Sequence, residues 1–355
     1  MRAGPPSVES QDSPSGAKLE LESFDSFEAV RETWCSLPIR SIFATWGWNR
    51  TWWRHFGRGR LLRLNVIRDE QGSVVAIIPL YVWRQRGLRV VRFVGSPHAD
   101  ELGPLGDASP AEQAAALDTA LAELRHDVFL GEQLDGELPW AELLEGHPWR
   151  VEAGPVLRFE GTWDEYLESK SANFRGQVRR LERRLRKRHR AVFRLVTAPE
   201  RLDCELDVFF SLHRERWRNS SNALRHESFH RDVAAVAARE GFLRLWMLDL
   251  DGDPAAGLLG YRVGDIESYV QAGRGLAYAS ESVGFVLMAH AVRTALTDRV
   301  GEYRFLRGGE SFKYRFANTD PRRESVVRAG TRKGRPAVAA GLAVMKMRRR
   351  WTEGR

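Results

Sequence analysis

Three charged residues near the C-terminal end of the chain are spaced so that they can act on one ligand. Arg307, Glu310 and Lys313 follow a short predicted strand and fall within seven residues. A carboxylate in this position can accept a proton, and a cation beside it can bind a phosphate or polarise a carbonyl group. The Gly308-Gly309 pair lets the backbone bend around a ligand. The alternative is an exposed Glu–Lys and Glu–Arg network, which contributes little to stability.

A loop of small residues, 273–284, joins a predicted strand to a predicted helix. Its sequence is GRGLAYASESVG, and Gly284 falls in the first turn of the helix. The first backbone N–H groups of a helix lack intrahelical partners and the helix dipole is positive there, so this junction favours an anion such as phosphate. Ser280 or Ser282 can cap the helix. The candidate phosphate site therefore comprises Ser280, Ser282, Val283 and Gly284; the alternative is an ordinary loop with a serine cap.

Four further side chains are candidates for binding a substrate. Tyr269 and Gln271 stand two residues apart on the strand before this loop, so strict alternation places both on one face. Trp217 ends a predicted helix and can form the wall of a pocket, and Arg315 follows the charged group. For Tyr269 and Trp217 the alternative is packing in the core.

The sequence offers no recognisable metal site or disulfide framework. The two cysteines, Cys35 and Cys204, lie far apart and form no CxxC motif, as in proteins of the reducing cytoplasm. His226 and His230 have i, i+4 spacing and His213 lies nearby, but no convincing third ligand completes a set. We therefore expect no metal ion.

The positive charge is concentrated in two short segments. The 355-residue chain has a net charge of +8. Residues 175–190 and 328–355 each carry nine Lys or Arg and one Glu, so the rest of the chain has a net charge of −8. This distribution argues against a uniformly basic protein that coats nucleic acid, and we expect no specific DNA binding.

Length and composition indicate two globular lobes without a membrane span. A chain of this length with 43% hydrophobic residues can bury two cores. Residues 1–20 are rich in Ser, Pro and Gly, which is typical of a disordered leader rather than a targeting signal. The longest apolar runs fall short of the ~20 residues that cross a bilayer. We expect a cytoplasmic protein, with peripheral contact to the inner membrane as an option.

The element pattern predicts an α/β protein with similar element order in its two lobes. The first lobe, 21–150, has predicted helices at 25–37, 43–56 and 111–124 and strands at 61–68, 73–83, 89–94 and 128–133. The second lobe, 151–330, has predicted strands at 156–159, 192–197, 243–250, 255–263, 266–272, 304–306 and 325–328. Its helices start at 162 and span 171–189, 201–217, 230–240 and 283–298. A basic tail, 331–355, follows.

The closing motif of the second lobe resembles a known family. Residues 305–316, FLRGGESFKYRF, resemble the closing motif of CelD/BcsL-like GNAT acyltransferases, which are linked by name to bacterial cellulose and exopolysaccharide biosynthesis. Residues 312–316 are also similar to the Phe-Lys-x-x-Phe ending of Fem-type aminoacyl transferases. Residues 43–57, the hairpin sequence DEQG and residues 78–81 (IPLY) resemble the family's first lobe, and residues 214–217 its Arg-x-x-Trp. The Arg/Gln-x-x-Gly-x-Gly/Ala string of ordinary GNAT enzymes is missing, so the resemblance is to a divergent branch.

The resemblance implies a fold, a co-substrate and a reaction. The fold would be two tandem GNAT-like lobes, each a mixed, mostly antiparallel sheet flanked by helices. Acetyl-CoA or a longer acyl-CoA would bind with its pyrophosphate at residues 280–284, and an amine would attack the thioester. Glu310 would accept the amine's proton, Lys313 or Arg307 would bind a phosphate or polarise the thioester carbonyl, and Trp217, Tyr269, Gln271 and Arg315 would contact the substrates. The pathway would be exopolysaccharide or envelope biosynthesis.

Two other functions remain open because of the basic helix 171–189. Its apolar stripe, Phe174, Val178, Leu181 and Leu185, predicts docking on a lobe. Its charged residues, Arg175–Arg190, can attract tRNA, a membrane or an acidic polysaccharide, or can simply be solvated. A Fem-like transferase using aminoacyl-tRNA and a non-catalytic GNAT scaffold are therefore the alternatives. The amphipathic segment 338–351 can contact a membrane or partner, or be disordered.

Overall fold

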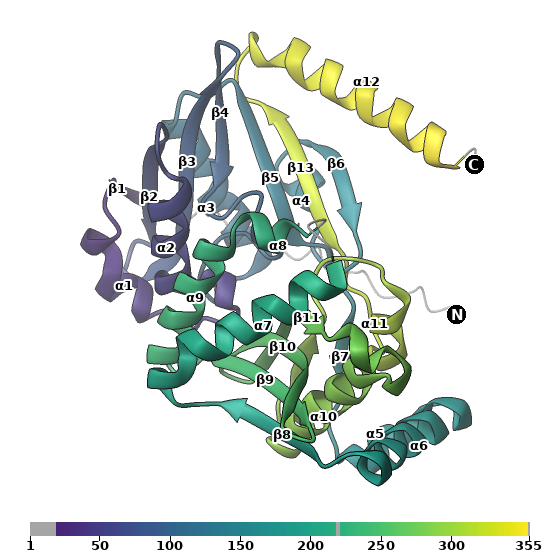
Figure 1. Ribbon diagram of the computed structural model, residues 1–355. Helices are drawn as coiled ribbons and strands as arrows, with labels where there is room; N and C mark the ends of the chain where they lie inside the picture. Colours follow the sequence, from purple (N-terminus) through teal and green to yellow (C-terminus); the bar gives the residue numbers. More distant parts are fainter. Residues whose placement is uncertain (1–18, 218–220, 354–355) are drawn as a thin grey trace, which may run out of the picture.

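Two mixed sheets form the framework of the protein (Figure 1). The structure is a computed structural model and describes residues 19–217 and 221–353. The first sheet has the strand order β1-β2-β3-β4-β5-β13-β6 and the second the order β7-β12-β11-β10-β9-β8. Helices flank both sheets, which confirms the predicted α/β class with two mixed, mostly antiparallel sheets. The lobe boundaries near residues 150 and 330 stay a prediction.

The first sheet is built mostly from the N-terminal part of the chain. Its strands are β1 (Glu20–Phe24), β2 (Leu61–Arg68), β3 (Val74–Gln85), β4 (Leu88–Phe93), β5 (Val128–Asp135), β6 (His147–Glu152) and β13 (Arg323–Ala329). Its helices are η1 (Glu28–Val30), α1 (Arg31–Cys35), η2 (Ile42–Ala44), α2 (Trp46–Phe56), α3 (Pro110–Glu123) and α4 (Trp140–Leu143). The capping box of Ser109 and Glu112 starts α3, as short polar residues do at helix N-termini.

The return of β13 to the first sheet corrects one expectation from the sequence. Residues 325–328 were expected to close the second sheet, but β13 pairs with β5 and β6. Val326 is fully buried there and joins the core that contains Phe129 and Trp140. The short apolar pattern predicts a strand correctly, but nothing local in it specifies which sheet the strand joins.

The second sheet carries the helices that surround the site. Its strands are β7 (Val156–Arg158), β8 (Ala191–Val196), β9 (Leu243–Leu250), β10 (Asp253–Val263), β11 (Ile266–Arg274) and β12 (Glu302–Arg304). Its helices are α5 (Trp163–Ser169), α6 (Ala172–Arg188), η3 (Pro199–Arg201), α7 (Leu202–Trp217), α8 (Asn222–Arg225), α9 (Glu227–Arg239), η4 (Leu276–Glu281), α10 (Val283–Thr297) and α11 (Ser311–Phe316). Helix α10 connects β11 to its parallel neighbour β12.

The two sides of the second sheet face different cores. Leu259 and Tyr261 of β10 pack in a core with α7, α9 and α2 of the first lobe. Leu258 of the same strand packs on the other side, in a core with α5, α6 and α10. Trp48 of α2 contacts Phe229 of α9 edge to face at 5.6 Å, so the first core runs across the junction of the two lobes. Continuous burial of this kind fixes the lobes against each other.

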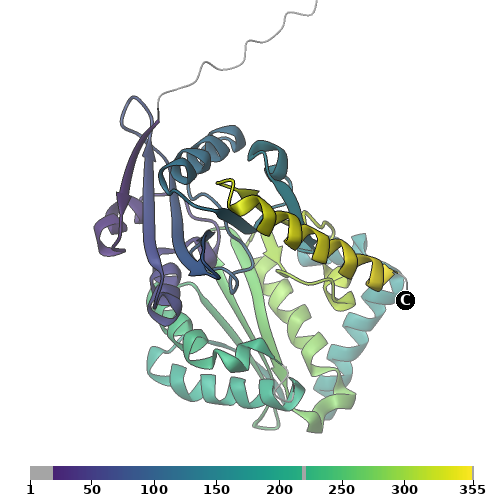
Figure 2. The ribbon, with the colours of Figure 1, turned by 90° about the horizontal axis from the view of Figure 1, so that it is seen from above.

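The C-terminal segment forms a helix, whereas most of the N-terminal segment lies outside the described residues. The predicted leader, residues 1–20, lies almost wholly outside the described residues, although Glu20 begins β1. The basic tail forms the helix α12 (Gly334–Glu353), drawn in yellow in Figure 2. Its first half packs through Val338 against Val327. Among the described residues, no helix is long and apolar enough to cross a membrane.

Candidate functional site

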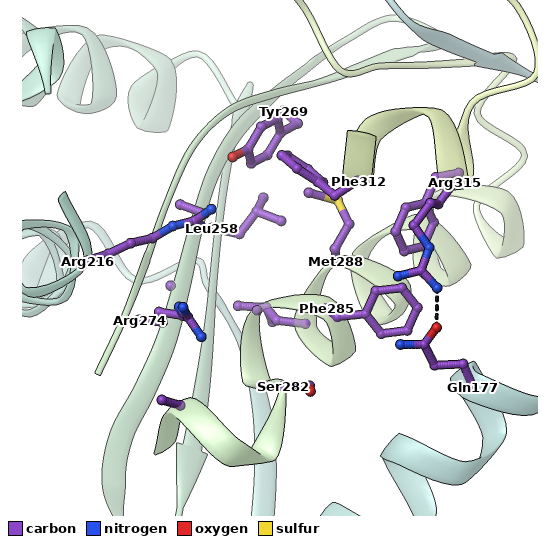
Figure 3. Close-up of a pocket in the computed structure, with 16 residues that line it drawn as sticks. Gln177, Arg216, Leu258, Tyr269, Arg274, Ser282, Phe285, Met288, Phe312 and Arg315 are labelled. Carbon is purple, nitrogen blue, oxygen red and sulfur yellow. Dashed lines mark hydrogen bonds between the residues drawn. The ribbon is translucent and has the colours of Figure 1, made fainter. Parts of the chain in front are cut away.

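A cavity of about 320 Å³ opens between β11, the start of α10 and α11 (Figure 3). Its apolar walls come mainly from β10, α10 and α11, and three of its six polar side chains are arginines. The residues that line it are Gln177, Arg216, Gly257, Leu258, Tyr269, Ala272, Arg274, Ala279, Ser282, Gly284, Phe285, Leu287, Met288, Phe312, Arg315 and Phe316. A mostly apolar pocket with a few convergent polar groups is the usual form of a small-molecule site.

One edge of strand β11 is open beside this cavity. The parallel ladder with β12 covers Ile266–Ser268 only, because β12 ends at Arg304. Among the described residues, 269–274 have ladder partners in β10 alone. Half of the backbone N–H and C=O groups of a strand point to each edge, so this segment presents hydrogen-bonding groups that no neighbouring strand uses.

A β-bulge at Val270 decides which side chains of β11 line the cavity. Leu259 pairs with Gln271 and Gly260 pairs with Tyr269, so Val270 is the extra residue. Such a residue inverts the alternation of the strand. Tyr269 and Ala272 therefore line the cavity, whereas Gln271 is half-buried and does not line it. The expectation that Tyr269 and Gln271 share a face was wrong, because strict alternation does not hold across a bulge.

Of the four predicted phosphate-site residues, Ser282 and Gly284 line the cavity, at the start of α10. Val283 is fully buried in the core, and Ser280 is exposed, with its carbonyl accepting a bond from Arg184 at 2.7 Å. Ser282 takes a left-handed conformation (φ 58°), and its side chain forms no cap bond. The predicted serine cap is therefore absent, which leaves the first N–H groups of α10 without a side-chain acceptor.

The charged loop before α11 is organised by a buried ammonium group. Lys313 Nζ donates to the carbonyl of Arg307 at 2.6 Å and to that of Leu306 at 3.4 Å, and it lies 2.9 Å from Glu310 Oε2. These three partners occupy its three donors. Arg307 instead pairs with Asp100 of the first lobe at 3.1 Å. None of Arg307, Glu310 and Lys313 lines the cavity, although α11 itself does.

Two further predicted residues lie at the cavity, one in its lining and one beside it. Arg315 lines it, bonds the side-chain oxygen of Gln177 and lies 4.7 Å from the ring centre of Phe285. Trp217 is partly exposed, and its indole donates to the carbonyl of Ala272 at 3.4 Å without lining the cavity. Tyr269 is buried, and burial raises its pKa to about 12, so its phenol keeps its proton at neutral pH.

The sequence-based prediction missed Gln177, Arg216, Arg274 and Phe312 as lining residues. Arg216 lies within the segment 214–217 and Arg274 within the loop 273–284, both of which were singled out for other residues. An unpaired arginine next to a small-residue loop is the signal that could have identified Arg274. Nothing local indicated Gln177, because it reaches the cavity only through the packing of α6.

The histidines named from the sequence have different contacts. His213 contacts the carbonyl of Ala272 at 2.9 Å, whereas His226 packs edge to face on His98 at 4.8 Å at the lobe junction. His230 also lies at this junction, packed on Phe229. Among the residues that the structure describes, no group of three or more His, Cys, Asp or Glu is arranged to hold a metal ion.

Comparisons with known proteins agree with this geometry at the level of the fold. The family model described as acetyltransferase (GNAT) domain matches residues 172–314, which include α10, the open edge of β11 and most of α11. No curated protein matches the sequence significantly. The second lobe thus has the fold of GNAT-type acyltransferases.

Three solved structures are similar over nearly the whole chain. A conserved protein of unknown function from Bacteroides thetaiotaomicron VPI-5482 has a TM-score of 0.60 at 12% identity, over 87% of this chain and 99% of that one. FemX has a TM-score of 0.59 at 10% identity, over 87% and 97%. The C-terminal domain of a putative lysylphosphatidylglycerol synthetase from Agrobacterium fabrum has a TM-score of 0.57 at 12% identity, over 90% and 95%. At identities this low the similarity shows a shared fold alone.

Proposed function

We propose that the protein is an acyl-CoA-dependent N-acyltransferase that binds its thioester in the cavity beside β11. The observation that carries this proposal is the open edge of β11 next to the uncapped start of α10. The pantetheine arm of CoA contains two amide groups, which can pair with backbone groups of β11 that no neighbouring strand uses, as an added strand would; the carbonyl of Ala272 is already contacted by His213 and Trp217. The match of residues 172–314 to the acetyltransferase (GNAT) domain supports this proposal.

The phosphate end of the donor would bind at the start of α10. Ser282 and Gly284 line the cavity there, and apart from its chain neighbours and its own helix backbone no atom lies within 4 Å of the position that a Cβ at Gly284 would occupy. A pyrophosphate can therefore approach the backbone N–H groups closely. Arg274 lines the same cavity and has no ion pair with the described chain, so its charge is available for the phosphates.

The transfer itself needs few protein groups because a thioester is already activated. The amine nitrogen would bond to the carbonyl carbon, the C–S bond would break, and the thiolate of CoA would take up a proton. Tyr269, which keeps its proton, is our candidate donor to that thiolate. Holding both reactants in one cavity contributes much of the rate.

We retain Glu310 as the proposed acceptor of the amine's proton. Its half-exposed carboxylate precedes α11, whose Phe312 lines the cavity, and its charge acts on both Tyr269 and Arg216. Lys313 and Arg307 would hold the loop in place, through the backbone carbonyls and Asp100, rather than bind phosphate. An acceptor from exopolysaccharide or envelope biosynthesis is supported by the resemblance of residues 305–316 alone.

A second candidate function, aminoacyl transfer from tRNA, is favoured by the exposed face of α6. The apolar stripe Phe174, Val178, Leu181 and Leu185 is buried on the lobe, as expected. Arg179, Arg180 and Arg183 are exposed, and each lacks a carboxylate partner within the described chain. Such a face can bind a phosphate backbone, with an affinity that falls steeply with salt.

Calorimetric titration with acetyl-CoA and longer acyl-CoAs tests the first candidate against the second. Binding that depends on acyl length, followed by release of free CoA thiol when an amine is added, supports the N-acyltransferase. No binding of any CoA to the folded protein, with salt-dependent binding of aminoacyl-tRNA, supports the alternative. The triple variant Arg179→Gln, Arg180→Gln, Arg183→Gln should weaken tRNA binding and leave CoA binding unchanged. A folded protein that binds neither would be the non-catalytic scaffold.

A further inference from the structure

The cavity is lined by three cationic groups and by no carboxylate. Arg216, Arg274 and Arg315 contribute guanidinium groups, and none of the other lining residues is Asp or Glu. Arg315 is held by Gln177 and packs on the rings of Phe174 and Phe285. The protein's own side chains therefore hold the guanidinium of Arg315 in the cavity wall. Arg216 and Arg274 need a separate explanation.

Arg216 contrasts with three other partly buried arginines of the described chain, which are neutralised by carboxylates. Arg194, Arg262 and Arg304 each pair with two carboxylates. Arg216 lies 4.7 Å from the ring centre of Trp217 and forms no ion pair with the described chain. Burial, together with the charge of Arg274, lowers its pKa, and the charge of Glu310 offsets this only in part because no carboxylate of the described chain contacts the guanidinium. Holding a cation in a half-buried site without an anion is unfavourable, so such a group is typically a binding group.

The side chains of Arg216 and Arg274 lie at different parts of the cavity. Figure 3 shows Tyr269 and Phe312 at one end and Ser282 at the other, with Arg274 nearer Ser282 and Arg216 between Arg274 and Tyr269. Arg274 is therefore placed for the donor phosphates at α10. Arg216 is nearer the Tyr269 end, where the proposed thioester would meet the amine.

We infer that Arg216 binds a carboxylate carried by one of the two reacting substrates, close to the reacting group. This inference rests on the proposed function and narrows its substrate class. A guanidinium matches the two oxygens of a carboxylate through parallel N–H bonds, and the surrounding ring and apolar walls strengthen such a pair. The carboxylate can come from a dicarboxylic acyl group on CoA or from an amine that also carries an acid group.

Two calorimetric titrations separate these sources. The first compares succinyl-CoA with butyryl-CoA, which differ in the carboxylate at the end of a chain of the same length. The second compares γ-aminobutyrate with its amide, with and without CoA present. In one of these two titrations we expect the carboxylated ligand to bind at least about tenfold more tightly than its neutral counterpart. The neutral ligand cannot form the charge-assisted hydrogen bond to the partly buried guanidinium of Arg216.

Variants of α7 test whether Arg216 is responsible. Arg216→Gln should abolish the preference, and Arg216→Lys should retain part of it. The matched control is Arg214→Gln on the same helix, because Arg214 pairs with Glu227 at 2.8 Å and does not line the cavity; this variant should keep the full preference.

Equal binding of both members in both titrations, or a preference that survives in Arg216→Gln, would overturn the inference. Its failure is distinguishable from failure of the proposed function. If butyryl-CoA binds and neither titration shows a preference, the acyltransferase stands and the carboxylate specificity is wrong. If no CoA binds, the acyltransferase proposal fails, and the amine titration alone decides the role of Arg216.

Discussion

Glu101 Oε2 lies 3.0 Å from Arg304 Nη1, across the junction of the two sheets. Glu101 follows β4 of the first sheet, and Arg304 ends β12 of the second. The same carboxylate bonds Arg323, the first residue of β13, and accepts from Ser41 Oγ at 2.6 Å. One buried side chain therefore joins both sheets at the point where the chain returns to the first.

We expect Glu101→Gln to destabilise the protein by up to about 3–5 kcal/mol, because the neutral amide removes the buried charge that Arg304 and Arg323 share and leaves them only Glu302 and Asp135 as carboxylate partners. Burial alone would raise the pKa of Glu101, but Arg323 and Arg304 lower it below its ordinary value. The stabilisation from Glu101 is therefore present above that ordinary value and is lost as the pH falls. Urea unfolding at pH 7 and near pH 4 should show a smaller gap between variant and wild type at the lower pH.

The control for this change is Glu137→Gln, since Glu137 forms a half-exposed pair with Arg158 at 2.9 Å. Exposed pairs contribute roughly 0–1 kcal/mol, so this variant should unfold almost as the wild type does. Equal effects of the two substitutions at pH 7 would show that Glu101 does not hold the sheets together.

Gly284→Trp should block CoA binding while the fold persists. A Cβ at Gly284 meets no atom within 4 Å, so the ring can extend into the cavity without displacing the backbone. It would then occupy the space proposed for the pyrophosphate. Calorimetry with acetyl-CoA measures the loss, and circular dichroism checks the fold. Gly176→Trp is the matched control, since this helical glycine is exposed and also has open space around it. Wild-type affinity in folded Gly284→Trp would disprove the phosphate site.

Glu310→Gln should slow turnover by about a hundredfold without weakening CoA binding, as is typical when a general base is removed. The amide keeps a hydrogen-bond acceptor for Lys313, so the loop should hold its shape. Steady-state release of CoA thiol gives the rate. Lys313→Met separates shape from chemistry, because it deprives the carbonyls of Leu306 and Arg307 of their donor and should also lower stability. A normal rate in Glu310→Gln would show that water accepts the proton.

His98 should make the fold sensitive to mild acid. Burial, together with the charges of His226 and Arg60, lowers its pKa from an ordinary 6.5 to about 4, and its Nδ1 accepts from the indole of Trp52 at 2.9 Å. Between these two pH values His98 is protonated in the unfolded chain but neutral in the folded one. The free energy of unfolding should therefore decrease as the pH is lowered from 6.5 to 4, by up to about 1.4 kcal/mol per pH unit.

His98→Asn should flatten this dependence, because the amide oxygen can still accept from Trp52 but does not titrate. Chemical unfolding from pH 7 to pH 4.5 measures the slope. His147→Asn, at an exposed position of β6, should leave the slope unchanged. A variant His98→Asn with the wild-type slope would assign the acid sensitivity to other groups, such as His230, whose pKa burial also lowers to about 4.

Local patterns predicted most of the fold. The bounds of β2 and β9 agree with the predicted ones, and Thr162 and Ser171 cap α5 and α6. These features depend on residues adjacent in the sequence, and their physics is visible there. The apolar stripe of α6 is buried for the same reason.

What the sequence did not predict depends on contacts between distant segments. The bulge at Val270 follows from how β11 meets β10: a Cβ on Gly260 would lie 2.5 Å from the carbonyl oxygen of Ser268. Lys313 is buried because the loop before α11 folds back over it. Neither Gln271 nor Lys313 could be placed without these pairings, which is why the candidate site was correct in its region and wrong in some of its residues.

The position of β13 between β5 and β6 also sets an order of events during synthesis on the ribosome. Among the described strands β6 pairs with β13 alone, so β5 and β6 each emerge with an unpaired edge and stay so until residues 323–329 are made. Unpaired edges invite association with other chains. The nascent first sheet would therefore depend on prompt completion of the chain or on a chaperone, and a ribosome stalled before residue 323 would release an aggregation-prone fragment.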